Sequence, residues 1–165
     1  MSMLISEEMT RKLNHQVTEE FSAAHTYQAM RCAFNAMGLK IMAQRFQAQA
    51  DEERGHGMKL LNYIMDVGAA VELEAIPKPS ADVGSPMAIL KGALQAELAV
   101  TKQYNELMAF AEGEKDYATR SFLQWFVNEQ VEEVSSMSDL LHLAEMAKGN
   151  MLQVEMRVRH AMMGK

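Results

Sequence analysis

The sequence predicts an all-α protein, an up-down-down-up four-helix bundle followed by a short fifth helix. Only three prolines and nine glycines interrupt the 165 residues, which favours long helices over many short strands. Hydrophobic residues make up 48% of the chain and aromatic residues only 7%, so the core is expected to be aliphatic. The length is that of one domain, taken as residues 1–165, with room for a sizeable core.

Cap and turn residues give the bounds of the first two helices. Ser6 is a suitable N-cap for a first helix that runs to about Met37. Gly38 then allows the tight turn that joins antiparallel neighbours. A second helix is expected over about residues 39–67, with Gly68 at its end.

The same signals give the bounds of the other helices. Ser85-Pro86 pairs a capping serine with a proline at the first helical position, and this third helix ends near Gly113. Asp116 caps a fourth helix that runs to about Lys148. The bundle therefore covers about residues 6–148, and a short fifth helix follows over about 150–163.

The stretch from residue 69 to residue 85 determines the topology. A helix of about 28 residues is roughly 42 Å long, whereas 17 extended residues span up to about 56 Å. This connection can therefore run the whole length of the bundle. The second and third helices are then parallel, and two similar hairpins make up the bundle.

One spacing between polar residues occurs twice in the chain. Glu53 follows Glu20 by 33 residues (53 − 20) and opens the segment Glu53-Arg54-Gly55-His56. Gln130 follows Glu97 by 33 residues (130 − 97) and opens the segment Gln130-Val131-Glu132-Glu133. The two halves of the chain thus repeat one pattern of potential metal ligands.

Helical geometry brings these side chains together. Residues three positions apart share one face of a helix, and a residue seven positions on returns to it. Tyr27 stands seven residues after Glu20, and Tyr104 stands seven after Glu97. Each half would therefore aim three oxygen or nitrogen donors and a phenol at one place. Because the donors lie roughly 11 to 15 residues into their helices, they meet at mid-height. This is the ligand supply of a two-metal site.

A solvated helix surface is the ordinary place for a glutamate, and it is the alternative to a buried site. The neighbours of Glu97 argue against it, since Leu90, Ala93, Leu94 and Val100 lie on the same face. A buried carboxylate stays ionised only if it is paired or bound to a metal. Cations between the carboxylates would remove their mutual repulsion.

The types of donor indicate the metal. Carboxylate oxygens with a single imidazole suit iron or manganese better than zinc, which prefers Cys and more His. His56 lies three residues after Glu53 and is expected to be a ligand. His15 and His25 have no such partner and are expected to be ordinary polar residues.

Composition also bears on partners and compartment. The net charge of −6 argues against nucleic-acid binding, which needs a basic surface. No apolar stretch approaches the roughly 20 residues that cross a bilayer, and the first residues do not read as a signal peptide. A single cysteine, Cys32, fits a reducing compartment. We therefore expect a cytoplasmic protein without nucleic-acid or membrane partners.

Several segments resemble bacterial non-haem ferritin over nearly the whole chain. The Glu plus Glu-x-x-His pattern itself is typical of ferritin-like di-iron proteins. The resembling segments are Leu13-Asn14-His15-Gln16, Tyr27-Gln28, Glu52-Glu53 with His56, Lys102-Gln103-Tyr104-Asn105-Glu106-Leu107, Asp116-Tyr117 and Phe122-Leu123-Gln124-Trp125-Phe126-Val127-Asn128-Glu129-Gln130. Together they form a specific match.

The resemblance implies a ferroxidase centre with these residues as iron ligands. The first iron would be held by Glu20, Glu53 and His56, with Glu53 bridging to the second. The ligand positions of the second iron are matched by Glu97, Gln130 and Glu133. A third iron site, which bacterial ferritins also have, is matched by Glu52, Glu129 and Glu132, although solvated charge explains these three almost as well.

Two departures separate the chain from related families, and a third position approaches one of them. Gln130-x-x-Glu133 replaces the second Glu-x-x-His of bacterioferritin and rubrerythrin-like proteins. Arg54 stands where bacterioferritin has its haem-binding Met, so no haem is expected, although Met58 lies one turn further along. Tyr104 approaches the bacterioferritin pattern and leaves the electron-donor role of Tyr27 open.

The resemblance implies iron storage and detoxification. Fe(II) would be oxidised to Fe(III) by dioxygen or hydrogen peroxide, and the product stored as mineral in a hollow shell of 24 subunits whose channels the fifth helix lines. Two alternatives remain, a soluble di-iron oxidase or peroxidase without storage and a purely structural helical bundle.

Overall fold

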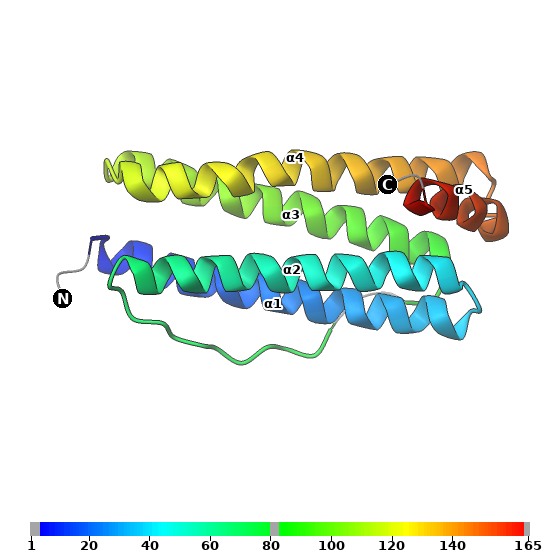
Figure 1. Cartoon of the computed structure of the whole chain (residues 1–165), viewed down its shortest axis with the longest axis horizontal. Helices are drawn as coiled ribbons and strands as arrows, with labels where there is room; N and C mark the ends of the chain where they lie inside the picture. Colours follow the sequence, from blue (N-terminus) through cyan, green and yellow to red (C-terminus); the bar gives the residue numbers. More distant parts are fainter. Residues whose placement is uncertain (1–3, 80–82, 164–165) are drawn as a thin grey trace.

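The computed structural model describes residues 4–79 and 83–163, and these form five α-helices. Four long helices lie side by side as two antiparallel pairs, with the fifth at one end (Figure 1). They are α1 (Glu7–Ala36), α2 (Lys40–Asp66), α3 (Pro86–Gly113), α4 (Tyr117–Met146) and α5 (Met151–Met163). The all-α bundle predicted from the sequence is confirmed. Within the described ranges no helix is long and apolar enough to cross a membrane.

The three predicted N-caps are present. The side-chain oxygen of Ser6 accepts a hydrogen bond from the Met9 N–H at 3.0 Å, and Ser85 Oγ accepts one from Ala88 at 3.1 Å. Asp116 Oδ1 accepts one from Thr119 at 3.0 Å. Each bond satisfies a backbone donor that the first helical turn leaves free.

The connection between α2 and α3 sets the direction of the second hairpin. It leaves one end of the α1–α2 pair and passes along its outside, and α3 begins at the opposite end (Figure 1). Asn14 of α1 holds its first part, because its Nδ2 donates to the Ala70 carbonyl at 2.9 Å and its Oδ1 accepts from the Glu72 N–H at 2.8 Å. As predicted, α2 and α3 therefore run in the same direction.

The fifth helix is fixed to the start of α2. Leu39, the residue before α2, offers no side-chain cap. Instead Glu155 of α5 accepts hydrogen bonds from the backbone N–H groups of Ile41 and Met42, at 2.7 and 3.0 Å. A carboxylate at this position also interacts favourably with the helix dipole. This charged side chain thus helps to anchor α5, whose Val154 also packs into the core.

The apolar core consists of two clusters, one towards each end of the bundle. The cluster at the α5 end includes Phe34, Phe46 and Val154. The other includes Met9 and Leu60 near the opposite end. Between them lies a layer of buried polar side chains.

Candidate metal centre

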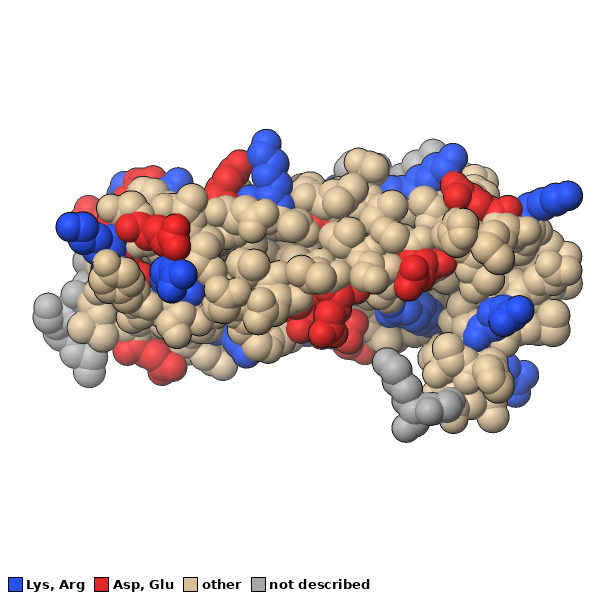
Figure 2. Space-filling model, turned by 90° about the horizontal axis from the view of Figure 1, so that it is seen from above, with Lys and Arg blue, Asp and Glu red and all other residues tan. Residues whose placement is uncertain are grey.

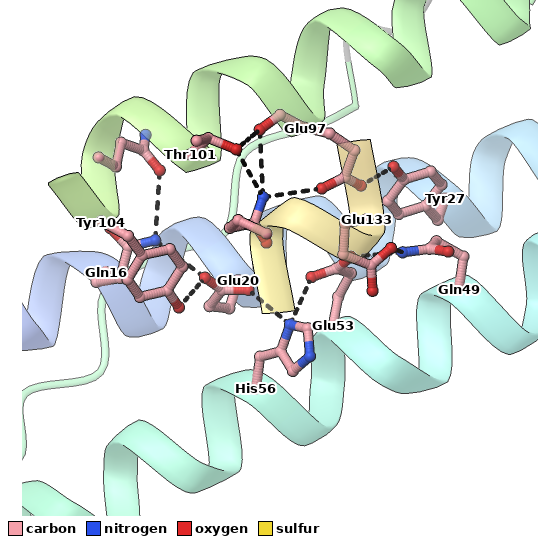
Figure 3. A network of polar contacts seen from close by, with 12 residues as sticks. Gln16, Glu20, Tyr27, Gln49, Glu53, His56, Glu97, Thr101, Tyr104 and Glu133 are labelled. Carbon is pink, nitrogen blue, oxygen red and sulfur yellow. Dashed lines mark hydrogen bonds and ion pairs between the residues drawn. The ribbon is translucent and has the colours of Figure 1, made fainter. Parts of the chain in front are cut away.

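The buried polar layer contains the six residues that the sequence pattern singled out as donors. All six are at least 94% buried, and all four long helices contribute (Figure 3). They are Glu20 from α1, Glu53 and His56 from α2, Glu97 from α3, and Gln130 and Glu133 from α4. The alternative, that the glutamates at these positions are solvated surface charges, is therefore wrong.

One group of donors joins α1 and α2. His56 Nδ1 lies 3.1 Å from Glu53 Oε2 and 3.5 Å from Glu20 Oε2. One ligand atom from each of the three residues lies within 4.8 Å of the others. Glu20 Oε2 is buried and receives no hydrogen bond from the described residues. A cation between these side chains would satisfy that oxygen.

A second group crosses the bundle and shares one member with the first. Ligand atoms of Glu53, Glu97 and Glu133 also lie within 4.8 Å of one another. Because Glu53 belongs to both groups, its carboxylate could bridge two neighbouring cations. Oxygen donors with one imidazole fit iron or manganese.

Gln130 contacts the second group through its amide. Its Nε2 lies 3.2 Å from Glu97 Oε2 and 3.2 Å from Thr101 Oγ1, and donates to both. The Gln130 carbonyl oxygen is the atom that could bind a metal, as the sequence predicts. Its role as a ligand stays a prediction.

Two buried tyrosine side chains each donate a hydrogen bond to the one donor glutamate that α1 or α3 contributes. Tyr27 donates a hydrogen bond to Glu97 Oε1, and Tyr104 donates one to Glu20 Oε1. Burial, together with the nearby carboxylates, raises the pKa of both tyrosines well above the usual value. Each phenol therefore remains a donor, and each crosses from one hairpin to the other (Figure 3).

Gln16 and Gln49 contact the centre but did not emerge from the sequence pattern. Gln16 Nε2 donates to Glu20 Oε1 at 2.9 Å, and Gln49 Nε2 donates to Glu53 Oε1 at 2.9 Å. Each glutamine stands four residues before its glutamate, and the two are again 33 residues apart (49 − 16). This repeated Gln-x-x-x-Glu was the signal that could have found them.

Protons balance the charge of the centre when no metal is bound. Burial raises the pKa of Glu53 to about 8 and that of Glu133 to about 7, and it also raises the pKa of Glu97. Burial alone would lower the pKa of His56, but hydrogen bonds and the charges of Glu20 and Glu53 raise it to about 10. Binding of cations must therefore displace protons.

The three residues expected at a third iron site lie outside the buried layer. Glu129 is half-buried, while Glu52 and Glu132 are exposed. Ligand atoms of Glu129 lie within 4.8 Å of those of His56 and Glu133, but no such group among the described residues includes Glu52 or Glu132. All three line a groove of about 810 Å³ that continues to α5. Figure 2 shows acidic side chains near mid-length of the bundle and α5 projecting at one end.

Comparison with known proteins agrees with this architecture. The model of the ferritin family, described as the ferritin-like domain, matches residues 10–147. A bacterial non-heme ferritin of Staphylococcus aureus (strain USA300) is 42% identical over 132 residues, 80% of each chain. One from Staphylococcus haemolyticus is 39% identical over 133 residues, 81% of this chain and 80% of the relative.

Solved structures show the same fold. An open pore ferritin from the hyperthermophilic archaeon Archaeoglobus fulgidus superimposes with a TM-score of 0.90 at 34% identity. The match covers 94% of this chain and 96% of that one. The resemblance to bacterial non-haem ferritin that the sequence motifs indicate is confirmed. The family match over residues 10–147 and the 42% identity to a bacterial non-heme ferritin show that the chain belongs to the ferritin family.

Proposed function

We propose that this protein stores and detoxifies iron by acting as a ferroxidase. It oxidises Fe(II) to Fe(III) at the paired donor groups and keeps the product as a mineral inside a shell of 24 subunits. The main support for this proposal is the position of Glu53. Its carboxylate belongs to two donor groups at once and could bridge a pair of ions. Family membership supports iron storage, and the relatives named as bacterial non-heme ferritins support it further.

The charges of the centre suit a pair of iron ions. Glu20, Glu53, Glu97 and Glu133 carry four negative charges when all are ionised, equal to the charge of two Fe(II) ions. Oxidation to Fe(III) adds positive charge, which buried carboxylates favour. Glu20, Glu53 and His56 would hold the first ion, and Glu97, Gln130 and Glu133 the second, with Glu53 bridging.

Electrons and protons balance for either oxidant. Two Fe(II) ions release one electron each. Dioxygen takes up both electrons and two protons and leaves as hydrogen peroxide. If hydrogen peroxide is the oxidant, two electrons and two protons convert it to two waters. The protons that leave Glu53 and Glu133 on metal binding are available nearby.

We further propose that the subunit works without haem, in a reducing cytoplasm, and binds neither nucleic acid nor membranes. Arg54 has only donors on its guanidinium and no lone pair for a metal, and it lies 3.4 Å from the carboxylate of Asp51. Arg54 and Met58 line a pocket of about 360 Å³ between α1, α2 and the connection. Cys32 is a free thiol.

Particle mass and iron content together test the proposal. A shell of 24 subunits of 18.5 kDa would have a mass of about 444 kDa, whereas a di-iron oxidase without storage would elute as a small oligomer. Anaerobic titration should show at least two Fe(II) bound per subunit. A small particle would exclude storage, and absence of tight Fe(II) binding would leave only the structural bundle.

Replacing Glu129 and Glu132 together with alanine should affect only the third iron. These carboxylates lie outside the buried layer, so the first two ions should bind as in wild type. Iron bound per subunit before mineral growth should fall from about three, the capacity that the resemblance implies, towards the two of a di-iron centre. Anaerobic titration and crystallography of iron-soaked protein would measure the change. Glu145→Ala, an exposed change on the same helix, is the control. Three irons in the double variant would show that the two carboxylates are ordinary surface charges.

A further inference from the structure

Gln49 connects two carboxylates of the centre that come from different helices. Its side chain lies in α2 one turn before Glu53 and is 1% exposed. The amide nitrogen Nε2 donates to Glu53 Oε1 at 2.9 Å and to Glu133 Oε2 at 2.7 Å. Both N–H bonds of one amide are thus used, one for a carboxylate of α2 and one for a carboxylate of α4.

Arg45 determines which way this amide faces. Arg45 Nη1 donates to Gln49 Oε1 at 3.1 Å, and Arg45 Nη2 donates to Ser136 Oγ of α4 at 2.8 Å. A guanidinium has donors but no acceptor, so the Gln49 oxygen must face Arg45. The two N–H groups must then face the carboxylates.

The two carboxylates depend on Gln49 to different extents. Glu53 also contacts His56 through its other oxygen, at 3.1 Å. Among the described residues, the Glu133 carboxylate accepts a hydrogen bond only from Gln49. Glu133 belongs to the second donor group and Glu53 to both. Without the Gln49 amide, the carboxylates of the second donor group would therefore be less restrained than those of the first.

We propose that Gln49, oriented by Arg45, is a positioning residue that fixes Glu133 and Glu53 for the second cation of the pair. The inference rests on the proposed two-ion function. It adds a residue that sets the geometry of the second cation site. The amide occupies Glu133 Oε2 and Glu53 Oε1, so the cations would bind through Glu133 Oε1 and through Glu53 Oε2, whose contact with His56 they would replace. It also holds α4 at a fixed distance from α2 at the level of the centre.

Gln16 provides a matched comparison within the same chain. It makes the same bond to its own glutamate, at 2.9 Å. Its other partner, however, is the amide oxygen of Gln103 at 3.3 Å, not a second carboxylate. Gln16 therefore orients Glu20 alone, which belongs to the first donor group.

Anaerobic titration of the full-length apo protein with Co(II) tests the proposal. Calorimetry gives the two affinities, and the visible absorption of Co(II) reports the coordination of each ion. Gln49→Met keeps the length of the side chain and removes the donors. It should weaken the second Co(II) by roughly 10-fold to 100-fold and change the first much less, the range typical of residues that hold a ligand. Gln16→Met should weaken the first Co(II) instead.

Two further variants complete the experiment. Gln47 lies on the same helix, and the only hydrogen bond of its side chain to another described residue is to Asp51. Gln47→Met should leave both affinities unchanged. Arg45→Met frees the amide to turn and should weaken the second Co(II) in the same direction but less. If Gln49→Met does not fold, Arg45→Met serves as the test variant in its place.

The outcomes separate the inference from the function on which it rests. Wild type that binds two Co(II) while Gln49→Met keeps both affinities overturns the role of Gln49 alone. A lower melting temperature with unchanged Co(II) binding would do the same and show a structural role. Wild type that cannot bind two Co(II) overturns the paired site and, with it, this role.

Discussion

Replacing Glu53 and His56 together with alanine is expected to abolish fast Fe(II) oxidation while the bundle still folds. Glu53 belongs to both donor groups, and His56 belongs to the first, so neither ion keeps its full set of ligands. The rate should fall to that of Fe(II) oxidising without protein. Stopped-flow absorbance at two Fe(II) per subunit measures the rate, and circular dichroism follows folding.

The fold should survive because both changes fall in the buried polar layer and leave the two apolar clusters of the core intact. The pKa of His56 is raised to about 10 beside Glu20 and Glu53, so the imidazole is a cation in the apo protein. Removal of this cation leaves Glu20 without its ion-pair partner, but removal of Glu53 takes one carboxyl group out of the cluster and so limits the repulsion between the carboxylates that remain. Glu145→Ala, an exposed change on α4, is the control and should oxidise Fe(II) normally. Wild-type rates in the double variant would end the ferroxidase assignment.

Binding of Co(II) or Fe(II) is expected to strengthen steeply as the pH rises from 6 to 8. At pH 6, Glu53 (pKa about 8), Glu133 (pKa about 7) and His56 (pKa about 10) all hold protons. Since metal ligands must be deprotonated, binding releases about two to three protons, and affinity should rise roughly 100-fold to 1,000-fold per pH unit near pH 6. Calorimetry in buffers of different ionisation enthalpy counts the protons.

The same pKa shifts predict the opposite trend for the stability of the apo protein. The folded-state pKa values of Glu53 and Glu133 lie above the ordinary value of 4.5, so their contribution is full below about pH 4.5 and is lost as the pH rises through 7 and 8. The free energy of unfolding should therefore fall between pH 6 and 9, and divalent metal should reverse this. Glu133→Gln should release fewer protons on binding Co(II). Release of less than one proton by wild type would contradict the buried, protonated state.

The helices were predictable because their signals are local. Ser6, Ser85 and Asp116 cap the helices that the sequence assigns to them, since a cap needs only a side chain and the backbone three residues on. Lys115 and Lys148 were not predicted to adopt positive φ, at 59° and 52°. Glycine is the usual residue for that conformation, so the lysines gave no signal.

The donors of the centre were predictable for a similar reason. Positions such as Glu53 and His56 share a face through helical spacing, and similar depths in long helices place Glu20 and Glu97 at one level. Their burial is confirmed, whereas their roles as iron ligands stay predictions.

Contacts between distant segments could not be read from spacing. Gln49 bonds Glu133, 84 residues away, and the cap on α2 comes from Glu155, 114 residues away. Each contact depends on how α4 or α5 packs against α2. The direction of the Gln49 amide depends further on Arg45, whose partner Ser136 lies on another helix.

The position of the polar layer between two apolar clusters restricts how ions can travel through the subunit. A hydrated cation that moved along the bundle axis would have to pass between Phe34 and Phe46 on one side, or between Leu60 and Met9 on the other. All four side chains are at most 1% exposed. Such a passage through low-dielectric packing carries a large desolvation barrier. The apolar packing therefore closes both ends of the bundle to cations, and a route to the centre has to run between helices. Glu133 belongs to the polar layer and also lines the groove towards α5, so the seam between α2 and α4 is one such lateral opening.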